Sequence, residues 1–154
     1  MELVLWRHCD AESTLPDESR RLTARGRDEA ARVARWLLHR LPADCRILVS
    51  PALRAQQTAQ ALGRPFETSE ALAPGATVDD VLRGAGWPDA AGTTLVVGHE
   101  PTLGTVAGDL LDLEDVARPL AKGEVVWLRS RLDMPGQATV VATTRPDAIP
   151  RRHP

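Results

Sequence analysis

The chain has 154 residues, of which 43% are hydrophobic and 26% charged, and its formal net charge is −2 at pH 7. This length and composition are typical of one globular domain with a sizeable core. The slight negative charge argues against the nucleic-acid-binding class, which normally carries an excess of lysine and arginine. No apolar run approaches the roughly 20 residues that span a bilayer, and the start "MELVLW" is not a leader pattern, so we expect a cytoplasmic protein with no membrane partner.

The first third of the chain contains two apolar strands separated by a helix. Residues 2–7 are apolar on both faces, which predicts a short buried strand. Thr23 is a suitable cap for a helix that runs to about residue 40, because apolar side chains recur there at the i, i+3, i+4, i+7 spacing of one buried face. Residues 46–50, "RILVS", predict a second buried strand.

The middle of the chain contains two helices and a short strand. Ser50 followed by Pro51 predicts the N-cap and first-turn proline of a helix that continues to about residue 62. Residues 65–68 predict a short third strand. Residues 77–85 predict a short helix, which Gly86 ends.

The last third returns to buried strands. Residues 93–97, "TTLVV", predict a strand that Gly98 interrupts, and residues 102–113 predict a helix. Residues 123–132 and 138–144 predict two strands joined by the turn signal "DMPGQ".

Strands that alternate with helices of about ten residues predict crossover connections and parallel strand pairing. We therefore expect an α/β fold, a three-layer α/β/α sandwich whose central sheet is mostly parallel, with the final strand pair as an antiparallel edge. One domain should cover residues 1–145, and residues 146–154 should form a loose tail.

Basic and imidazole side chains follow three of the predicted strands. Arg7 and His8 come directly after the first strand, Arg54 lies in the first turn of the helix after the second, and His99 follows the glycine after "TTLVV". Ligands of open parallel sheets bind beyond the carboxyl ends of the strands. We therefore expect these four side chains to meet at one edge of the sheet.

The residue types in this group favour an anion. The planar guanidinium fork fits phosphate oxygens in two-point contacts, and the N–H groups of a helix start also bind phosphate, although a carboxylate would fit as well. Neutral imidazole adds a nucleophile and a proton carrier near pH 7. Each residue taken alone is as typical of a solvated charge or a loop contact, so the phosphate site is indicated by their shared placement.

Several stretches resemble the histidine phosphatase superfamily, which has the phosphoglycerate mutase-like fold. Its signature is an Arg-His pair after the first strand, a second arginine that opens a later helix, and a second histidine after a later strand, which Arg7-His8, Arg54 and His99 match. Finer motifs are similar to the small SixA-type branch, which removes phosphate from phosphohistidine. These stretches are "DESRRLTARG", with Arg21 where proline is usual, "VSPALRAQQTAQAL", "LVVGHEPTL", "LAPGATVDDVL" and "KGEVVWL".

The resemblance implies roles for individual residues. His8 would attack phosphorus and carry the phosphoryl group, Arg7 and Arg54 would hold its oxygens, and His99 would be a further oxygen contact and proton shuttle. Arg20 is a weaker candidate for substrate binding. No metal or other cofactor is implied, since the arginines supply the positive charge, and the chain has no C-x-x-C or H-x-x-x-H pair typical of zinc sites.

The chain departs from the family pattern at two places. Cys9 stands where glycine or alanine commonly follows the Arg-His pair, and inert packing is the favoured reading of its thiol. The region after the second predicted strand is too short for the insertion that carries a proton-donating carboxylate in larger relatives. Glu100 and Glu70 are the nearby alternatives for a proton donor.

The resemblance and the short connections favour one substrate class and leave two alternatives. An open site suits a phosphate presented on a macromolecule, so a phosphorylated protein such as a phosphotransfer domain is the expected partner. A small phosphate ester, such as a sugar or nucleotide phosphate, is the first alternative. A non-catalytic phosphate-binding regulatory module is the second, although it would not need a nucleophile at His8.

Overall fold

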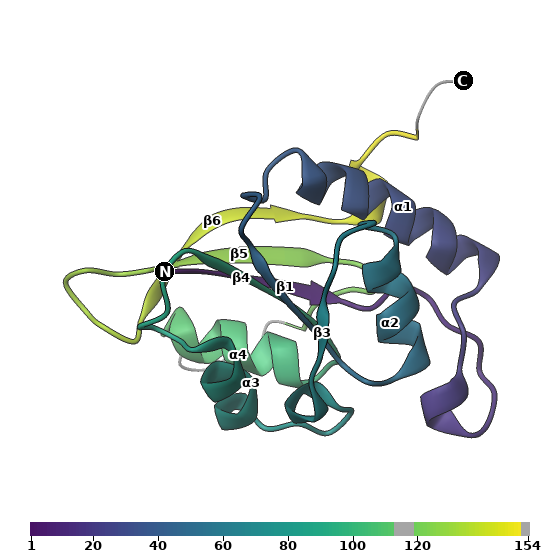
Figure 1. Cartoon of the computed structure of the whole chain (residues 1–154), viewed down its shortest axis with the longest axis horizontal. Coiled ribbons are helices and arrows are strands. Elements are labelled where there is room, and N and C mark those ends of the chain that lie inside the picture. Colours follow the sequence, from purple (N-terminus) through teal and green to yellow (C-terminus); the bar gives the residue numbers. More distant parts are fainter. Residues whose placement is uncertain (113–118, 152–154) are drawn as a thin grey trace.

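The computed structural model describes residues 1–112 and 119–151, and its six strands form one sheet in the order β3-β2-β4-β1-β5-β6 (Figure 1). The strands β1 to β4 pair in parallel, whereas β5 is antiparallel to both β1 and β6. The predicted mostly parallel sheet with an antiparallel edge is confirmed. The strands are β1 Glu2–Arg7, β2 Arg46–Val49, β3 Glu67–Thr68, β4 Thr93–Gly98, β5 Val125–Ser130 and β6 Ala138–Thr144.

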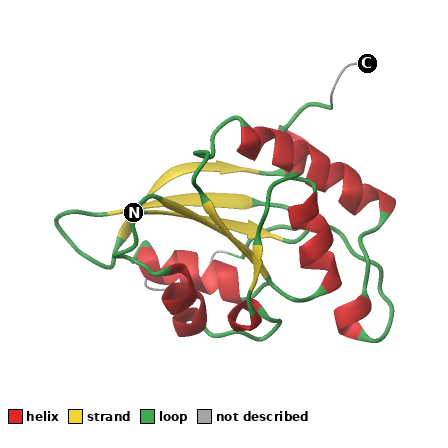
Figure 2. Ribbon diagram, viewed as in Figure 1, coloured by secondary structure: helices red, strands yellow, loops and turns green. Residues whose placement is uncertain are grey.

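Helices cover both faces of the sheet, as Figure 2 shows. Side chains of β1 alternate between the two cores: Val4 and Trp6 pack with α1 and α2, and Leu3 and Leu5 pack with α3 and α4. A strand that is buried on both faces reads as a continuous apolar run, which is why "LVLW" predicted it. The helices are α1 Ala24–Leu38, α2 Leu53–Gln60, α3 Val78–Ala85 and α4 Thr102–Leu110.

The predicted helix ends in α1 and α3 are built from short polar contacts. The Thr23 hydroxyl accepts a hydrogen bond from the Gly26 amide at 3.0 Å, and Thr77 forms a capping box with Asp80. Gly86 ends α3 in the left-handed region at φ 74°, a conformation that favours glycine. These local signals are sufficient to set helix boundaries from sequence.

The start of α2 differs from the prediction. The helix begins at Leu53 with Ala52 as its N-cap, and Ser50 lies outside it. The Ser50 hydroxyl accepts from the Ala52 amide at 3.2 Å and contacts His99, so a tertiary contact takes the side chain that was expected to cap the helix. Gly98 was expected to interrupt the strand before it, but it is the last residue of β4. The predicted end of α4 at residue 113 lies outside the described residues.

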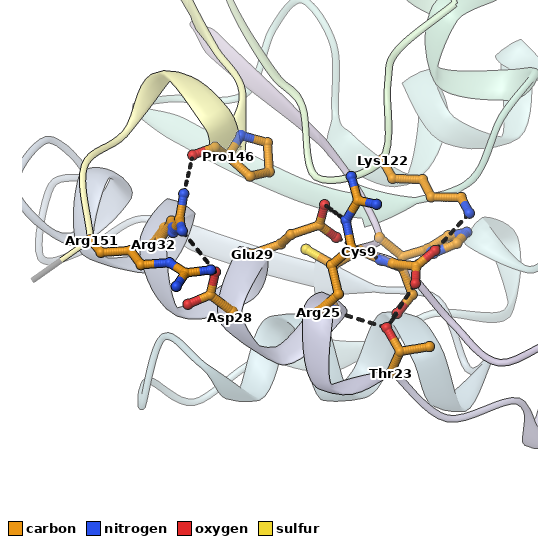
Figure 3. Close-up of polar contacts among 12 residues, drawn as sticks. Cys9, Thr23, Arg25, Asp28, Glu29, Arg32, Lys122, Pro146 and Arg151 are labelled. Atoms are coloured by element: carbon orange, nitrogen blue, oxygen red, sulfur yellow. Dashed lines mark hydrogen bonds and ion pairs between the residues drawn. The ribbon is translucent and has the colours of Figure 1, made fainter.

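The segment after β6 differs from the loose tail expected for residues 146–154. Residues 146–149 pack against α1, with Pro146 and Ile149 buried. The Arg32 guanidinium donates to the carbonyl oxygens of Pro146 and Ile149, and the same helix side contacts Arg151 through Asp28 (Figure 3). This segment is therefore held by burial of its own two apolar side chains and by the hydrogen bonds that Arg32 of α1 donates to it. Residues 152–154 lie outside the described residues.

None of the helices in the described ranges is long and apolar enough to cross a membrane.

Candidate active site

The sheet register brings the four predicted side chains to one edge. Arg7 pairs with Gly98 across β1 and β4, and Val49 pairs with Val97 across β2 and β4, so these strands end side by side. The His8 amide continues the ladder by donating to the Gly98 carbonyl oxygen at 3.0 Å. The rings of His8 and His99 lie next to each other, with their centroids 5.1 Å apart and their planes tilted by 55°.

His8 is held as a buried, neutral imidazole. Its residue exposure is 6%, and its Nδ1 lies 2.8 Å from the carbonyl oxygen of Cys9. A carbonyl oxygen only accepts, so we assign the proton to Nδ1, which leaves the lone pair on Nε2. Burial lowers the pKa of His8 to about 4, the contact with Cys9 opposes that shift, and the positive charges of Arg54, Arg7 and Arg20 add to it.

His99 is positioned by Ser50. Its Nε2 lies 2.7 Å from the Ser50 hydroxyl oxygen, and its Nδ1 is buried with no partner among the described residues. Burial lowers the pKa of His99 to about 3, and the neighbouring His8 and Arg54 contribute to the shift. The ring is therefore neutral near pH 7, with one nitrogen paired and the other available.

Each of the two arginines holds a buried Nε atom that has no partner among the described residues. Arg54 is 4% exposed, and its two terminal nitrogens donate to the backbone oxygen of Asp17 at 2.9 Å and to the Asp17 carboxylate at 3.1 Å. Arg7 donates from Nη1 to the Leu120 carbonyl oxygen at 2.8 Å. The Nε atoms of both arginines are buried with no partner in the described part of the chain. Together with Nδ1 of His99, they are three buried nitrogens at one strand edge that a bound anion would satisfy.

Arg20 lies in the same electrostatic environment. Its Nε is 3.1 Å from the Asp17 carboxylate, and its Nη1 donates to the Glu12 carbonyl oxygen at 3.3 Å. Its charge lowers the pKa of both His8 and His99. The structure thus brings Arg20 near the two histidines.

The two carboxylates considered as proton donors differ. Glu100 is half-buried next to Arg7; burial raises its pKa, and its carboxylate accepts from the Gly104 amide at 2.7 Å. Glu70 is exposed at the start of the 3-10 helix Glu70–Leu72, and within the described residues no hydrogen bond or ion pair links its side chain to the other candidates. Its burial, its raised pKa and its position directly after His99 therefore favour Glu100 as the proton donor.

The segment after His8 is anchored to the start of α1. The Cys9 amide donates to the Thr58 hydroxyl at 3.1 Å, and burial raises the pKa of the Cys9 thiol, which disfavours the thiolate. Asp10 is held by Glu29, Thr23 and Lys122, which gather around this segment in Figure 3. The backbone behind the candidate nucleophile is thus fixed by hydrogen bonds with Thr58 of α2 and Glu29 of α1, and Lys122 holds the Asp10 side chain.

Gly26 allows this close approach. A Cβ atom at Gly26 would lie 2.0 Å from the carbonyl oxygen of Asp10, far inside contact distance. Only a residue without a side chain therefore permits α1 to sit against the Asp10 backbone.

Sequence reasoning did not assign roles to Asp17 and Ser50 at the site. Asp17 pairs with Arg54 across 37 positions of the chain, and Ser50 contacts His99 across 49. The available signal for both was their place in the stretches "DESRRLTARG" and "VSPALRAQQTAQAL", which carry the family resemblance. Among the described residues, no group of three or more histidine, cysteine or acidic side chains could hold a metal ion.

Comparison with known proteins identifies the family of this chain. A family model described as histidine phosphatase superfamily (branch 1) matches residues 3–77. The phosphohistidine phosphatase SixA of Escherichia coli is 31% identical over 119 residues, which cover 71% of this chain and 74% of that protein. The chain belongs to the histidine phosphatase superfamily. The predicted family is therefore confirmed.

Three further proteins are similar to this histidine phosphatase, over different shares of its length. An uncharacterized protein of Mycobacterium tuberculosis is 39% identical over 98 residues, so the match spans only 60% of that relative and 60% of this chain. The structure of a putative phosphohistidine phosphatase SixA from Nakamurella multipartitia covers 94% of this chain and 95% of its own, with a TM-score of 0.80 and 28% identity. A protein histidine phosphatase SixA complexed with tungstate covers 96% of this chain and 99% of its own, with a TM-score of 0.78 and 26% identity.

Proposed function

We propose that this chain is a phosphatase that uses His8 as a covalent nucleophile and removes phosphate from a phosphohistidine on a signalling protein. The observation that carries the proposal is the environment of His8. The His8 ring lies 5.1 Å from the ring of His99, centroid to centroid, and the charges of Arg7 and Arg54 act on it. Each of these three neighbours holds a buried nitrogen with no partner among the described residues. Similarity to SixA proteins supports the substrate class.

Binding would use the unpartnered nitrogens. The phosphoryl oxygens would accept hydrogen bonds from Nε of Arg7, Nε of Arg54 and Nδ1 of His99. For His99 this requires the proton on Nδ1, so that the Ser50 hydroxyl donates to Nε2 at their 2.7 Å separation. The charge on the transferring group spreads over its equatorial oxygens, and fixed guanidinium groups stabilise it there.

The first chemical step would form a bond between Nε2 of His8 and phosphorus while the bond from phosphorus to the leaving group breaks. The leaving nitrogen or oxygen takes the electron pair and then a proton. His8 is suited to this step because burial keeps it neutral well below pH 7. In the second step, water attacks phosphorus, the P–N bond returns its electron pair to His8, and orthophosphate leaves.

The leaving group bears on the substrate. Imidazole leaves more readily than an alkoxide, so a phosphohistidine substrate needs less help from a general acid than a phosphate ester does. Glu100 is half-buried with a raised pKa and is the donor we propose where one is needed. A small phosphate ester is the alternative substrate. A binding module without catalysis is the second alternative, and the neutral His8, with its lone pair assigned to Nε2, argues against it.

The decisive experiment traps the intermediate. Wild-type protein mixed with radiolabelled substrate and quenched rapidly should carry an acid-labile, base-stable label, as expected of a P–N bond, and His8→Ala should carry none. His8→Ala should lower kcat by about 10³-fold while inorganic phosphate still binds. Cys9→Ala is the matched control, and it should keep the label. Near-normal turnover in His8→Ala, or a label on Cys9, would show that His8 is not the nucleophile.

A second measurement addresses the substrate. The kcat/KM value for a phosphotransfer domain that is phosphorylated on a histidine is compared with the values for an aryl phosphate, a sugar phosphate and a nucleotide. We expect the phosphoprotein to be preferred. A preference for a small ester would reassign the substrate class and leave the covalent mechanism intact.

A further inference from the structure

Asp17 joins two arginines at the edge of the site. Its carboxylate lies 3.1 Å from Nη2 of Arg54 through one oxygen and 3.1 Å from Nε of Arg20 through the other. Its backbone oxygen accepts a second hydrogen bond from Arg54 at 2.9 Å. One residue of the short 3-10 helix Asp17–Ser19 thus contacts both guanidinium groups.

These contacts determine which part of Arg54 faces a ligand. Both terminal nitrogens of this buried guanidinium are committed to Asp17, and Nε is the nitrogen without a partner among the described residues. A guanidinium group is planar, so fixing two nitrogens fixes the direction of the third N–H. Asp17 therefore sets the orientation in which Arg54 can donate to a phosphoryl oxygen.

The charge of Asp17 also offsets repulsion between the arginines. Burial and the nearby Arg20 lower the pKa of Arg54, and Asp17 opposes this shift. Burial acts to raise the pKa of Asp17, but the charges and hydrogen bonds of Arg54 and Arg20 hold it below its usual value, so Asp17 is ionised at neutral pH. An anion between two cations is the arrangement that keeps both in one small volume.

We propose that Asp17 is a positioning residue for phosphate binding, which aims Nε of Arg54 at the phosphoryl group and keeps Arg20 beside it. This inference rests on the proposed function, since it assigns the orienting group for the same site. Asp17 itself carries negative charge and acts through the two arginines rather than on the substrate.

The test compares three variants of the full chain. Asp17→Ala removes both carboxylate contacts, Asp17→Asn keeps one acceptor oxygen but no charge, and Glu18→Ala removes the neighbouring acid of the same 3-10 helix as the matched control. The affinity for inorganic phosphate is measured by calorimetry, kcat and KM are measured with an aryl phosphate, and the melting temperature reports on folding.

Asp17→Ala should weaken phosphate binding by about 10-fold and lower kcat/KM by about 10- to 100-fold. Asp17→Asn should show about a third to a half of the loss seen in Asp17→Ala, when both losses are expressed as logarithms. Glu18→Ala should stay within about twofold of wild type. The melting temperature should fall in Asp17→Ala, because the buried Arg54 loses its counter-charge, although the 54% exposure of the Asp17 side chain limits that fall. In an Arg54→Ala background, Asp17→Ala should cause a smaller further loss than it does in wild type, since only its contact with Arg20 is left to lose.

Two results would overturn the inference. Phosphate affinity unchanged in Asp17→Ala would show that the carboxylate does not orient Arg54. An equal loss of affinity in Glu18→Ala would show that the effect does not come from the contacts of Asp17 with the two arginines. The phosphate measurement does not need turnover. If wild type bound phosphate but hydrolysed nothing, the proposed function would fail while the role of Asp17 in binding was still decided by calorimetry.

Discussion

Replacement of Gly26 by alanine tests how the loop behind His8 is held. The added Cβ atom would lie 2.0 Å from the Asp10 carbonyl oxygen and 2.9 Å from its carbonyl carbon. Carbon–oxygen contacts are normally about 3.3 Å or longer, so the two backbones must separate by roughly 1 Å. This movement strains the bonds from the Thr23 amide to the Asp10 oxygen and from the Asp10 amide to Glu29, each 3.0 Å long.

The magnitude follows from opposing contributions. Overpacking against backbone costs about 1–3 kcal/mol, and weakening two hydrogen bonds costs about 1 kcal/mol each. Alanine returns about 1 kcal/mol of helix propensity. We expect Gly26→Ala to lower the free energy of unfolding by about 2–4 kcal/mol, and displacement of His8, two residues before Asp10, to lower kcat/KM at least 10-fold.

The matched control is Gly84→Ala in α3. Its Cβ atom would lie 3.9 Å from the Cβ atom of Ala71, which is ordinary contact, so it should stabilise the protein by about 0.5–1 kcal/mol and leave kcat/KM unchanged. Urea unfolding and steady-state kinetics measure both variants. If Gly26→Ala were as stable and active as Gly84→Ala, the account of Asp10 as the fixed support of His8 would be wrong.

Three further predictions concern the imidazoles and the charge at the site. Ser50→Ala removes the 2.7 Å contact to His99 and should lower kcat/KM about 10-fold in steady-state kinetics; unchanged kinetics would deny Ser50 an orienting role. The folded-state pKa values of His8 and His99 lie below the usual 6.5. The free energy of unfolding should therefore fall as the pH is lowered from 6.5 toward 4, by up to about 1.4 kcal/mol per pH unit for each histidine. Urea unfolding that gave the same free energy across this pH range would contradict their buried neutral state. Activity should survive a chelator, since arginines supply the positive charge; loss that one divalent ion restores would overturn this.

Local patterns were sufficient to predict much of the fold. Apolar runs such as "LVLW" and "TTLVV" indicated strands buried on both faces, and Thr23 and Gly86 marked helix ends, because caps act within a few residues. The predicted start of α2 was wrong because the capping signal at Ser50 is local, whereas the partner of its side chain, His99, directly follows β4. The packing of residues 146–149 on α1 depends on a distant surface and had no local signal.

The candidate site was predictable to a different degree. The shared edge of Arg7, His8 and His99 follows from parallel pairing, since strand ends in register place the next residues together. The contacts of Asp17 with Arg54 could not be predicted, because they depend on where the 3-10 helix Asp17–Ser19 packs relative to α2. Side-chain orientation is decided by tertiary contacts that composition and periodicity do not encode.

The place of β1 in the sheet has a consequence for biosynthesis. This strand is made first, yet its two neighbours in the sheet are β4 and β5, which lie far downstream in the chain. Ribosomes add about 5–20 residues per second, so the apolar segment of β1 waits on the order of 6–25 s for both partners to be synthesised. During that interval Leu3, Val4, Leu5 and Trp6, which are fully buried in the finished fold, lack both of the strands that flank them there.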